Sequence, residues 1–431
     1  MRILIKDGRL LDPATDTDSK MDVLVEDGKV VKREIWIDEE KENVDEIIHA
    51  YGCYVMPGLI DLHVHLREPG FEYKETIETG TKAMAKGGFT SVCPMPNTKP
   101  STDSAEVVNW VLDKAKQDSP INVLPVGAIT IGQEGNELTD IEGMQEAGIV
   151  AISEDGKSVM NAKLYKEAMK EAARLDIPVM AHCEDRDLVG KGCINEGEKS
   201  RQFQVEGISN AVEDVIVARD ILLAKETGAR LHLCHCSTED SVTMIKEAKE
   251  AGLPVTGEVC PHHFVMSTDD MISDDANYKM NPPLRTKEDV EALKEGLKLG
   301  IMDVISTDHA PHSIEEKEKH ISEAPFGIVG SETAAALTIT HLVHTGWITP
   351  MQMAQKMSYN PAKIIGIDRG SLETGKVADI TIIDPNEEYI IDADTFVSKG
   401  KNTPFHGHTV KGKVKFTIVN GNIVYRDNEH K

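Results

Sequence analysis

The chain has 431 residues, of which 40% are hydrophobic and 28% are charged. This length allows two domains, or one large barrel with an accessory domain, and the composition is that of an ordinary globular protein. The 47 basic and 73 acidic residues give a net charge of −26, which argues against nucleic acids and anionic membrane surfaces as partners.

No apolar run approaches the length that crosses a membrane, and residues 1–7 are typical of a strand rather than of a secretory signal. The seven cysteines are an odd number without a Cys-x-x-Cys pair, which argues against a disulfide framework and against a structural zinc ribbon. We therefore expect a cytoplasmic protein with reduced, mostly buried cysteines.

Both ends of the chain are predicted to form short strands. Turn signals separate the N-terminal segments 2–6, 21–26 and 29 onward, and an Asn420-Gly421 turn joins 413–419 to 422–425, after a strand at 381–384. Strands at the two ends pair most simply with each other. We expect residues 1–53 and 366–431 to form one small β-sandwich.

Residues 54–365 alternate between strands and helices. After an opening strand near residue 60, apolar runs predict strands at 89–95, 121–129, 148–153, 178–182, 230–236, 254–260 and 302–306. Apolar residues spaced three and four apart predict helices that include 74–86, 162–175, 211–225, 239–251 and 287–299. Eight strand-helix units favour a (β/α)₈ TIM barrel over a doubly wound open sheet, because no strand precedes a Gly-x-Gly-x-x-Gly fingerprint.

The opening barrel strand carries a His-x-His pair. Leu62, Val64 and Leu66 alternate with polar residues, so that His63 and His65 point to the same side. Two neutral imidazoles placed in this way can chelate a divalent metal of the zinc type. Asp61, on the same face, is expected to hold a ring N–H of one of them; a polar strand face in contact with solvent is the alternative.

Further polar residues occur where barrel strands end, which is where barrel enzymes place their active sites. These are His63 and His65, Asp155, His182, His235 and Asp308. Four imidazoles and two carboxylates suffice for two metal ions with one bridging carboxylate, and this donor set suits zinc. His232, His341 and His344 are taken as core or surface residues, and His262 and His263 stay undecided.

Five motifs carry a resemblance to a known family. They are PGLIDLHVHLREPG at 57–70, MPNT at 95–98, AHCED at 181–185, HLCHCS at 232–237 and STDHAPH at 306–312. With these motifs the chain resembles the dihydroorotases of the amidohydrolase superfamily, in particular the long bacterial type. The His-x-His pair and the terminal aspartate occur across the superfamily, whereas REPG at 67–70 and PMPNT at 94–98 are specific to the dihydroorotase and allantoinase branch.

The resemblance implies two zinc ions in each subunit. It assigns His63, His65 and Asp308 to one ion and His182 and His235 to the other, with Asp155 and a hydroxide as bridges. Many relatives use a carboxylated lysine as the bridge, but the strand at 148–153 contains no lysine. Lys157 is the nearest candidate for carboxylation, and Glu154 stands where a second aspartate is common.

The implied reaction is the reversible conversion of N-carbamoyl-L-aspartate to L-dihydroorotate in pyrimidine synthesis. A hydroxide on the metals attacks the ring amide and Asp308 acts as general acid and base. The resemblance places Arg67, Asn97 and His312 at the substrate carboxylate, and Asn281 with the backbone of Phe326 and Gly327 at the ring. Without it, Arg67 could equally pair with Glu68 or Glu72 on the surface, and the asparagines could be loop residues. The loop 262–285 is a candidate lid.

Three other functions stay open. Allantoinases and hydantoinases or dihydropyrimidinases open related rings on the same scaffold, but they usually carry the bridging lysine that is absent here. A catalytically inactive scaffold is the third alternative, and such family members lose metal ligands. The expected partner is the small-molecule substrate; a homodimer and an association with aspartate transcarbamoylase are further possibilities that the resemblance raises.

Overall fold

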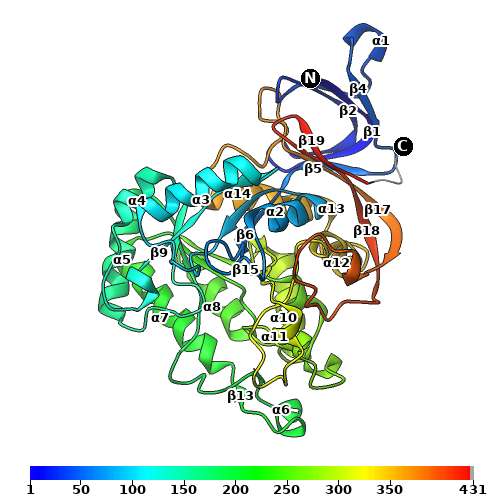
Figure 1. Ribbon diagram of the computed structural model, residues 1–431. Coiled ribbons are helices and arrows are strands. Elements are labelled where there is room, and N and C mark those ends of the chain that lie inside the picture. Colours follow the sequence, from blue (N-terminus) through cyan, green and yellow to red (C-terminus); the bar gives the residue numbers. More distant parts are fainter. Residues whose placement is uncertain (428–431) are drawn as a thin grey trace.

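The computed structural model describes residues 1–427. Its centre is a barrel of parallel strands, and a separate sheet built from both ends of the chain lies beside the barrel (Figure 1). Within residues 1–427 no helix is both long enough and apolar enough to cross a membrane.

The barrel contains eight strand positions in chain order. They are β6 (Leu59–Val64), β7 (Phe89–Pro94), β8 (Asn122–Val123) with β9 (Val126–Ala128), β10 (Ala151–Ser153), β11 (Val179–Ala181), β14 (Leu231–Leu233), β15 (Val255–Val259) and β16 (Val304–Ile305). The predicted strand 121–129 is interrupted: β8 pairs with β7 and β9 pairs with β10. Pro125 lies at the interruption, and proline has no N–H to donate to a ladder.

The seam between the first and last strands closes the barrel. It contains an isolated parallel bridge between Val64 and His309, with a hydrogen bond of 2.8 Å from His65 N to His309 O. The Asp61 carboxylate adds to the seam, since it accepts a hydrogen bond of 3.2 Å from the backbone N–H of Thr307.

Helices surround the barrel on the outside (Figure 1). They are α2 (Ile77–Lys86), α3 (Ala105–Asp118), α4 (Ile141–Ala147), α5 (Ala162–Leu175), α7 (Ala211–Thr227), α8 (Glu239–Glu250) and α10 (Lys287–Leu299), followed by continuous helices at 334–343 and 350–365 that each contain a π-helical turn. Capping explains the sharp ends. Thr286 begins α10 with a capping box to Asp289, and Gly300 ends it in the left-handed conformation. Shorter helices include α9 (Pro261–Val265) and α11 (Ile314–Lys317).

The terminal sheet has eight strands. They are β1 (Arg2–Asp12), β2 (Thr17–Glu26), β3 (Lys29–Glu34), β4 (Glu46–His49), β5 (Tyr54–Pro57), β17 (Ile380–Ile390), β18 (Thr409–Val419) and β19 (Asn422–Arg426). Strand β5 pairs with both β1 and β17 and so joins the two ends of the chain. The predicted hairpin is present as β18 and β19, with positive φ at Asn420 and Gly421 as its turn requires. Because the chain leaves this sheet at Pro57, we infer that the barrel domain begins at Gly58.

Separate hydrophobic clusters lie in the terminal domain and at the barrel strands. Side chains from both ends, among them Ile5, Val25, Ile380 and Ile418, share one core in the terminal domain. Apolar side chains of the barrel strands, such as Leu62, form another buried cluster, and polar groups occupy the carboxyl ends of the strands. The predicted fold class, a (β/α)₈ barrel with a β-sandwich from both termini, is confirmed.

Candidate active site

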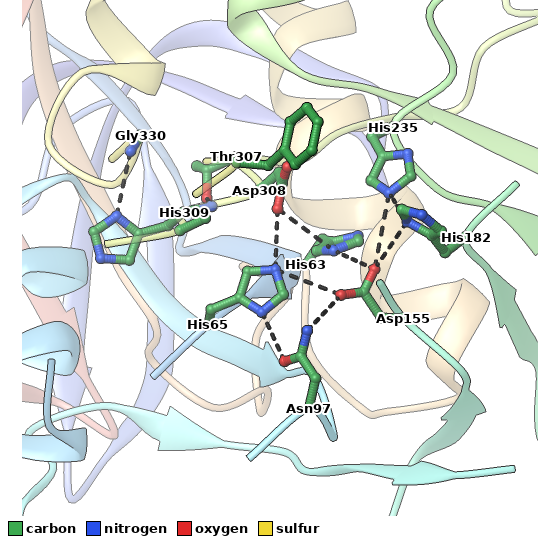
Figure 2. Close-up of polar contacts among 12 residues, drawn as sticks. His63, His65, Asn97, Asp155, His182, His235, Thr307, Asp308, His309 and Gly330 are labelled. Atoms are coloured by element: carbon green, nitrogen blue, oxygen red, sulfur yellow. Dashed lines mark hydrogen bonds and ion pairs between the residues drawn. The ribbon is translucent and has the colours of Figure 1, made fainter. Parts of the chain in front are cut away.

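Six predicted residues converge at the carboxyl ends of the barrel strands (Figure 2). His63 lies on β6, and the other five follow the ends of β6, β10, β11, β14 and β16 within three residues. All six are buried: His63, His65, Asp155, His182, His235 and Asp308. The structure therefore brings together the whole set that the sequence assigned to metal binding.

Asp155 is at the centre of this cluster. Its Oδ1 lies 3.2 Å from His63 Nε2, 3.4 Å from His182 Nδ1 and 3.8 Å from His235 Nε2. Its Oδ2 lies 3.6 Å from His65 Nε2. One carboxylate thus faces imidazoles from three other strands, which is the arrangement that a bridging ligand needs.

Asp308 lies on the side of the cluster formed by the His-x-His pair. Its Oδ1 is 3.1 Å from His65 Nε2 and 3.6 Å from His63 Nε2. On the opposite side, His182 Nδ1 and His235 Nε2 are 2.9 Å apart. The cluster therefore divides into two groups of nitrogen and oxygen atoms on either side of Asp155.

The charges of the cluster favour a cation. Burial alone would raise the pKa of the Asp155 carboxyl, but the neighbouring imidazoles hold it well below its usual value. Burial would likewise lower the pKa of His63, but the Asp155 carboxylate raises it well above the usual value. The buried carboxylates thus attract positive charge to the centre, which a divalent metal ion also supplies.

The donor atoms also fit a metal ion. His63 Nε2 is buried without a hydrogen-bond partner among the described residues, although it points at two carboxylates. Among the groups of described residues whose ligand atoms lie within 4.8 Å of one another, two consist of members of this cluster: His63, His65 and Asp308, and His63, Asp155 and His235. Imidazole and carboxylate donors at these spacings can hold divalent metal.

Glu258 on β15 is a site residue that the sequence analysis missed. Its buried carboxylate lies 3.0 Å from His63 Nδ1 and 3.0 Å from His232 Nε2, and it accepts a hydrogen bond of 3.1 Å from His235 N. It therefore fixes the ring of His63 with Nε2 toward the cluster. A charged residue inside an otherwise apolar barrel strand was the available signal.

The expectation for Asp61 was wrong. Its carboxylate accepts hydrogen bonds from the backbone N–H groups of His63 and Thr307 rather than from an imidazole, because its side chain turns to the seam of the barrel. Glu258 takes the ring N–H that was assigned to Asp61. His232, one of the residues taken as core or surface, is a core residue that pairs with Glu258.

Neither Glu154 nor Lys157 reaches the cluster. The Glu154 carboxylate accepts hydrogen bonds from the backbone N–H groups of Ile129 and Thr130. Lys157 Nζ donates a hydrogen bond of 3.0 Å to Gln133 O. Asp155 is thus the acidic group of this segment that faces the histidines.

Asn97 connects the two parts of the cluster. Its Oδ1 lies 2.9 Å from His65 Nδ1, and its Nδ2 donates a hydrogen bond of 3.0 Å to Asp155 Oδ2. Both ends of this amide are therefore in use. The side chain also lines the cavity above the cluster, so it lies between the carboxylates and any bound ring.

A cavity of about 150 Å³ opens over the cluster. Its lining includes most of the predicted substrate residues: Arg67, Asn97, Asn281, Phe326 and Gly327, with Asp155, Asp308 and three of the histidines. The volume suits a small ring rather than a polymer. It therefore agrees with the expectation of a small-molecule substrate.

The predicted carboxylate end of the cavity is built from loop residues. The half-buried Arg67 donates a hydrogen bond of 3.2 Å to Pro311 O and lies 3.3 Å from His312 Nε2; it does not pair with Glu68 or Glu72. His312 Nε2 is 2.7 Å from Phe326 O. Burial, with Arg67 and Lys74 nearby, lowers the pKa of His312 far below its usual value.

Asn281 and Gly327 also line the cavity, and Gly327 lies close to His312. Asn281 Nδ2 donates a hydrogen bond to the Glu184 carboxylate. Gly327 has a φ of 128°, and a Cβ at this position would lie 2.6 Å from Ala310 Cβ. Both the backbone conformation and the lack of space therefore require a glycine here. His263, left undecided by the sequence, is buried and lies 2.9 Å from Pro282 O through its Nε2, outside the cavity lining.

Relatives of known identity match the chain along nearly its whole length. The family described as "Dihydro-orotase-like" matches residues 52–241. A dihydroorotase of Acetivibrio thermocellus is 51% identical over 426 residues, which cover 99% of each protein. The chain belongs to the dihydroorotase family. A second dihydroorotase, from Bacillus cytotoxicus, is 49% identical with the same coverage. As a dihydroorotase-family member the chain is an enzyme of the cyclic amide hydrolase class, and the resemblance seen in the motifs is confirmed.

Solved structures place the dihydroorotase-family chain in the wider superfamily. An L-hydantoinase (dihydropyrimidinase) from Arthrobacter aurescens superimposes with a TM-score of 0.89 at 27% identity, covering 100% of this chain and 97% of that one. A dihydropyrimidinase from Brevibacillus agri gives a TM-score of 0.85 at 25% identity, with 99% and 95% covered. These neighbours share the architecture and represent the alternative branch, whereas the sequence relatives are dihydroorotases.

Proposed function

We propose that the chain catalyses the reversible, zinc-dependent cyclisation of N-carbamoyl-L-aspartate to L-dihydroorotate, a step of de novo pyrimidine synthesis. The observation that carries the proposal is that Arg67 lines the same small cavity as Asp155 and Asp308. A ring amide can then reach the metal-binding cluster while a carboxylate on the same ring reaches a guanidinium.

Two zinc ions would be held by the buried cluster. His63, His65 and Asp308 would hold one ion and His182 and His235 the other, with Asp155 shared between them. This sharing is supported by Asp155 Oδ1, which lies 3.2 Å from His63 Nε2 and 3.4 Å from His182 Nδ1 and so is close to members of both groups. When bound, zinc ions polarise an amide carbonyl and lower the pKa of a water molecule toward neutrality.

Asp308 is proposed as the general acid and base. Its carboxylate lines the cavity while its Oδ1 lies 3.1 Å from His65 Nε2, so it can contact both the attacking water and the ring. In the hydrolytic direction it would accept the proton of that water and donate it to the leaving ring nitrogen. In the reverse direction it would take the proton from the attacking carbamoyl nitrogen and donate it to the hydroxyl oxygen that leaves the substrate carboxyl carbon, so that water is released as the C–N bond forms.

The substrate carboxylate would bind at Arg67. The net charge of −26 repels anions at long range, but salt confines that repulsion to about 8 to 10 Å. Arg67 offers a fork of N–H donors that matches a carboxylate, and His312 lies beside it. Asn97 would contribute to the same carboxylate end, and Asn281 would orient the ring against the cluster.

The alternative is a hydantoinase or dihydropyrimidinase activity, because solved structures of that branch share the fold. Rings of that class carry no carboxylate for Arg67 to bind. The two activities therefore differ in whether a charged ring is preferred.

A direct test compares rings on zinc-loaded protein whose metal content has been measured. L-dihydroorotate, allantoin, hydantoin and dihydrouracil are offered at equal concentrations and ring opening is followed. We expect selective opening of dihydroorotate with about two zinc ions bound in each chain. Preference for an uncharged ring would contradict the proposed substrate and leave the metal site standing.

A further inference from the structure

Lys317 is a buried lysine at the end of α11 that contacts two loops of the substrate cavity. Its side chain is 8% exposed. Its Nζ donates hydrogen bonds of 2.9 Å to Gly327 O, 3.1 Å to Pro325 O and 3.3 Å to Lys279 O. One ammonium group thus joins the segment before Asn281 to the turn that contains Gly327.

These contacts fix the direction of the peptide groups in the turn. Pro325 O and Gly327 O point to Lys317, whereas the carbonyl between them, Phe326 O, points to His312 Nε2 at 2.7 Å. Gly327 N also donates a hydrogen bond of 3.0 Å to Lys279 O. The orientation of the Phe326 carbonyl therefore depends on the same carbonyls that hold Lys317.

The Phe326 carbonyl in turn selects one form of His312. A carbonyl oxygen only accepts hydrogen bonds, and Phe326 O is closer to Nε2 than the donor Arg67 Nη2 is, at 2.7 Å against 3.3 Å; this favours the form with the proton on Nε2. At Nδ1 the donor Lys74 Nζ, at 3.1 Å, is closer than the acceptor Glu316 Oε2, at 3.5 Å, which favours a lone pair there. A chain of contacts thus runs from Lys317 through the turn to the imidazole beside Arg67.

Burial makes the site of Lys317 unfavourable for an ammonium group unless hydrogen bonds compensate the lost hydration. Burial, together with the nearby ammonium of Lys279, lowers the pKa of Lys317 to about 7, against weaker opposing effects of Asp275 and Glu316. Only the protonated amine offers three N–H donors, which is the number of carbonyls it meets. A side chain with a purely space-filling role would not need to be charged here.

We propose that Lys317 is a positioning residue for substrate binding, which clamps the 325–327 turn to the 279–281 segment and thereby orients His312 and the cavity wall. Lys317 does not line the cavity over the metal-binding cluster, so it acts through these loops and not on the reacting atoms. The proposal rests on the proposed function, because it assigns the clamped wall to the carboxylate end of the substrate.

The test replaces Lys317 by methionine, which has a similar length and no donor. We expect KM for L-dihydroorotate to rise about tenfold to 100-fold, as for the loss of hydrogen bonds to a charged group. The value of kcat should change less than threefold and the zinc content should stay the same. Lys317→Gln, which keeps two donors on a shorter chain, should give an intermediate KM.

The matched control is Lys356→Met. Lys356 is also buried, and its Nζ donates a hydrogen bond of 2.7 Å to Met302 O, ahead of β16 at the amino end of the barrel. Its loss should lower thermal stability and leave KM unchanged. An equal rise of KM in the two variants would show a general effect of deleting a buried lysine and would overturn the proposal.

A second readout is independent of activity. Nitrogen-15 NMR of histidine-labelled protein, with His312 assigned through a His312→Gln variant, should show His312 protonated at Nε2 in the wild type and a mixture of tautomers in Lys317→Met. An unchanged tautomer with an unchanged KM would refute the role of Lys317, as would a failure of both Lys317 variants to fold. If the wild type does not open dihydroorotate, the proposed function fails, whereas the NMR result still decides about Lys317.

Discussion

The proposed metal-binding cluster and the proposed carboxylate end of the cavity are built in different ways. The six residues of the cluster lie on barrel strands or within three residues of their ends, and the buried Glu258 braces them from a neighbouring strand. Arg67, His312 and Gly327 lie on loops and are held through backbone carbonyls, including those of Pro311 and Phe326.

Substitutions in the two regions should therefore have different effects on activity. A strand-borne ligand has a fixed direction, so its replacement removes one donor and leaves the rest in place. The position of a loop residue depends on how the neighbouring loops are anchored. Its replacement should therefore weaken substrate binding gradually rather than abolish it. Chemistry should therefore depend on the cluster, and discrimination between rings on the loops.

The most severe loss is expected for Asp308→Asn. The amide keeps the shape of the side chain but cannot accept the proton at the same atom, so kcat should fall by about 10²- to 10⁴-fold. Steady-state kinetics on zinc-quantified protein provides the measurement. Asp303→Asn is the matched control at the other end of β16, where the carboxylate lies 2.7 Å from Lys249 Nζ; it should cost stability and leave kcat intact. Substantial residual turnover in Asp308→Asn would remove Asp308 from its role as base.

Glu258→Gln should weaken metal binding without removing a ligand. A glutamine fits the same space but offers a weaker acceptor to His63 Nδ1, so zinc affinity should fall about 10- to 100-fold. Competition with a chelator measures this affinity directly. Glu154→Gln, a buried carboxylate beside Asp155 that faces away from the cluster, should bind zinc as the wild type does. Equal affinities in all three proteins would mean that the strands alone orient the ligands.

Arg67→Gln should affect discrimination between rings. Loss of a charge-assisted contact to the carboxylate should raise KM for dihydroorotate about tenfold to 100-fold, with little change in zinc content. Any slow opening of dihydrouracil, which has no carboxylate, should be unaffected. A parallel loss on both rings would show that Arg67 supports the loop rather than the substrate.

The smallest effect on the site is expected from Lys356, which lies outside both regions. Burial lowers its pKa from 10.5 to about 8, so between these pH values the unfolded chain binds more protons than the folded one. The free energy of unfolding should then rise with pH across this window. Urea titrations at pH 8 and pH 10 should show a smaller rise in Lys356→Met than in the wild type. Identical rises would exclude this lysine as the source.

The strand-borne half of the site could be predicted because its geometry repeats locally. A period of two placed His63 and His65 on one face, and the rule that barrel sites lie at carboxyl ends selected Asp155, His182, His235 and Asp308. The same rules recovered the barrel and the terminal hairpin at Asn420 and Gly421. No relation between distant residues was needed for these predictions.

The rest depends on contacts between distant parts of the chain. Glu258 reaches His63 only through the register of neighbouring strands, and the period that aligned Asp61 with the histidines could not show that its carboxylate turns to the barrel seam. Lys317 lies in a charged stretch of sequence, Glu315 to Lys319, that is typical of a solvated surface. It is buried because the 279–281 and 325–327 segments fold over it.

The seam of the barrel has a consequence for how the protein matures. His63 and His65 lie on the strand that opens the barrel and Asp308 follows the strand that closes it, with only an isolated bridge and a few hydrogen bonds between them. The proposed ligand set is thus divided between residues 63–65 at the start of the barrel and residue 308 near its end. A polypeptide that ends before Asp308 therefore lacks one of the proposed metal ligands, and we expect it to bind metal more weakly than the full chain does.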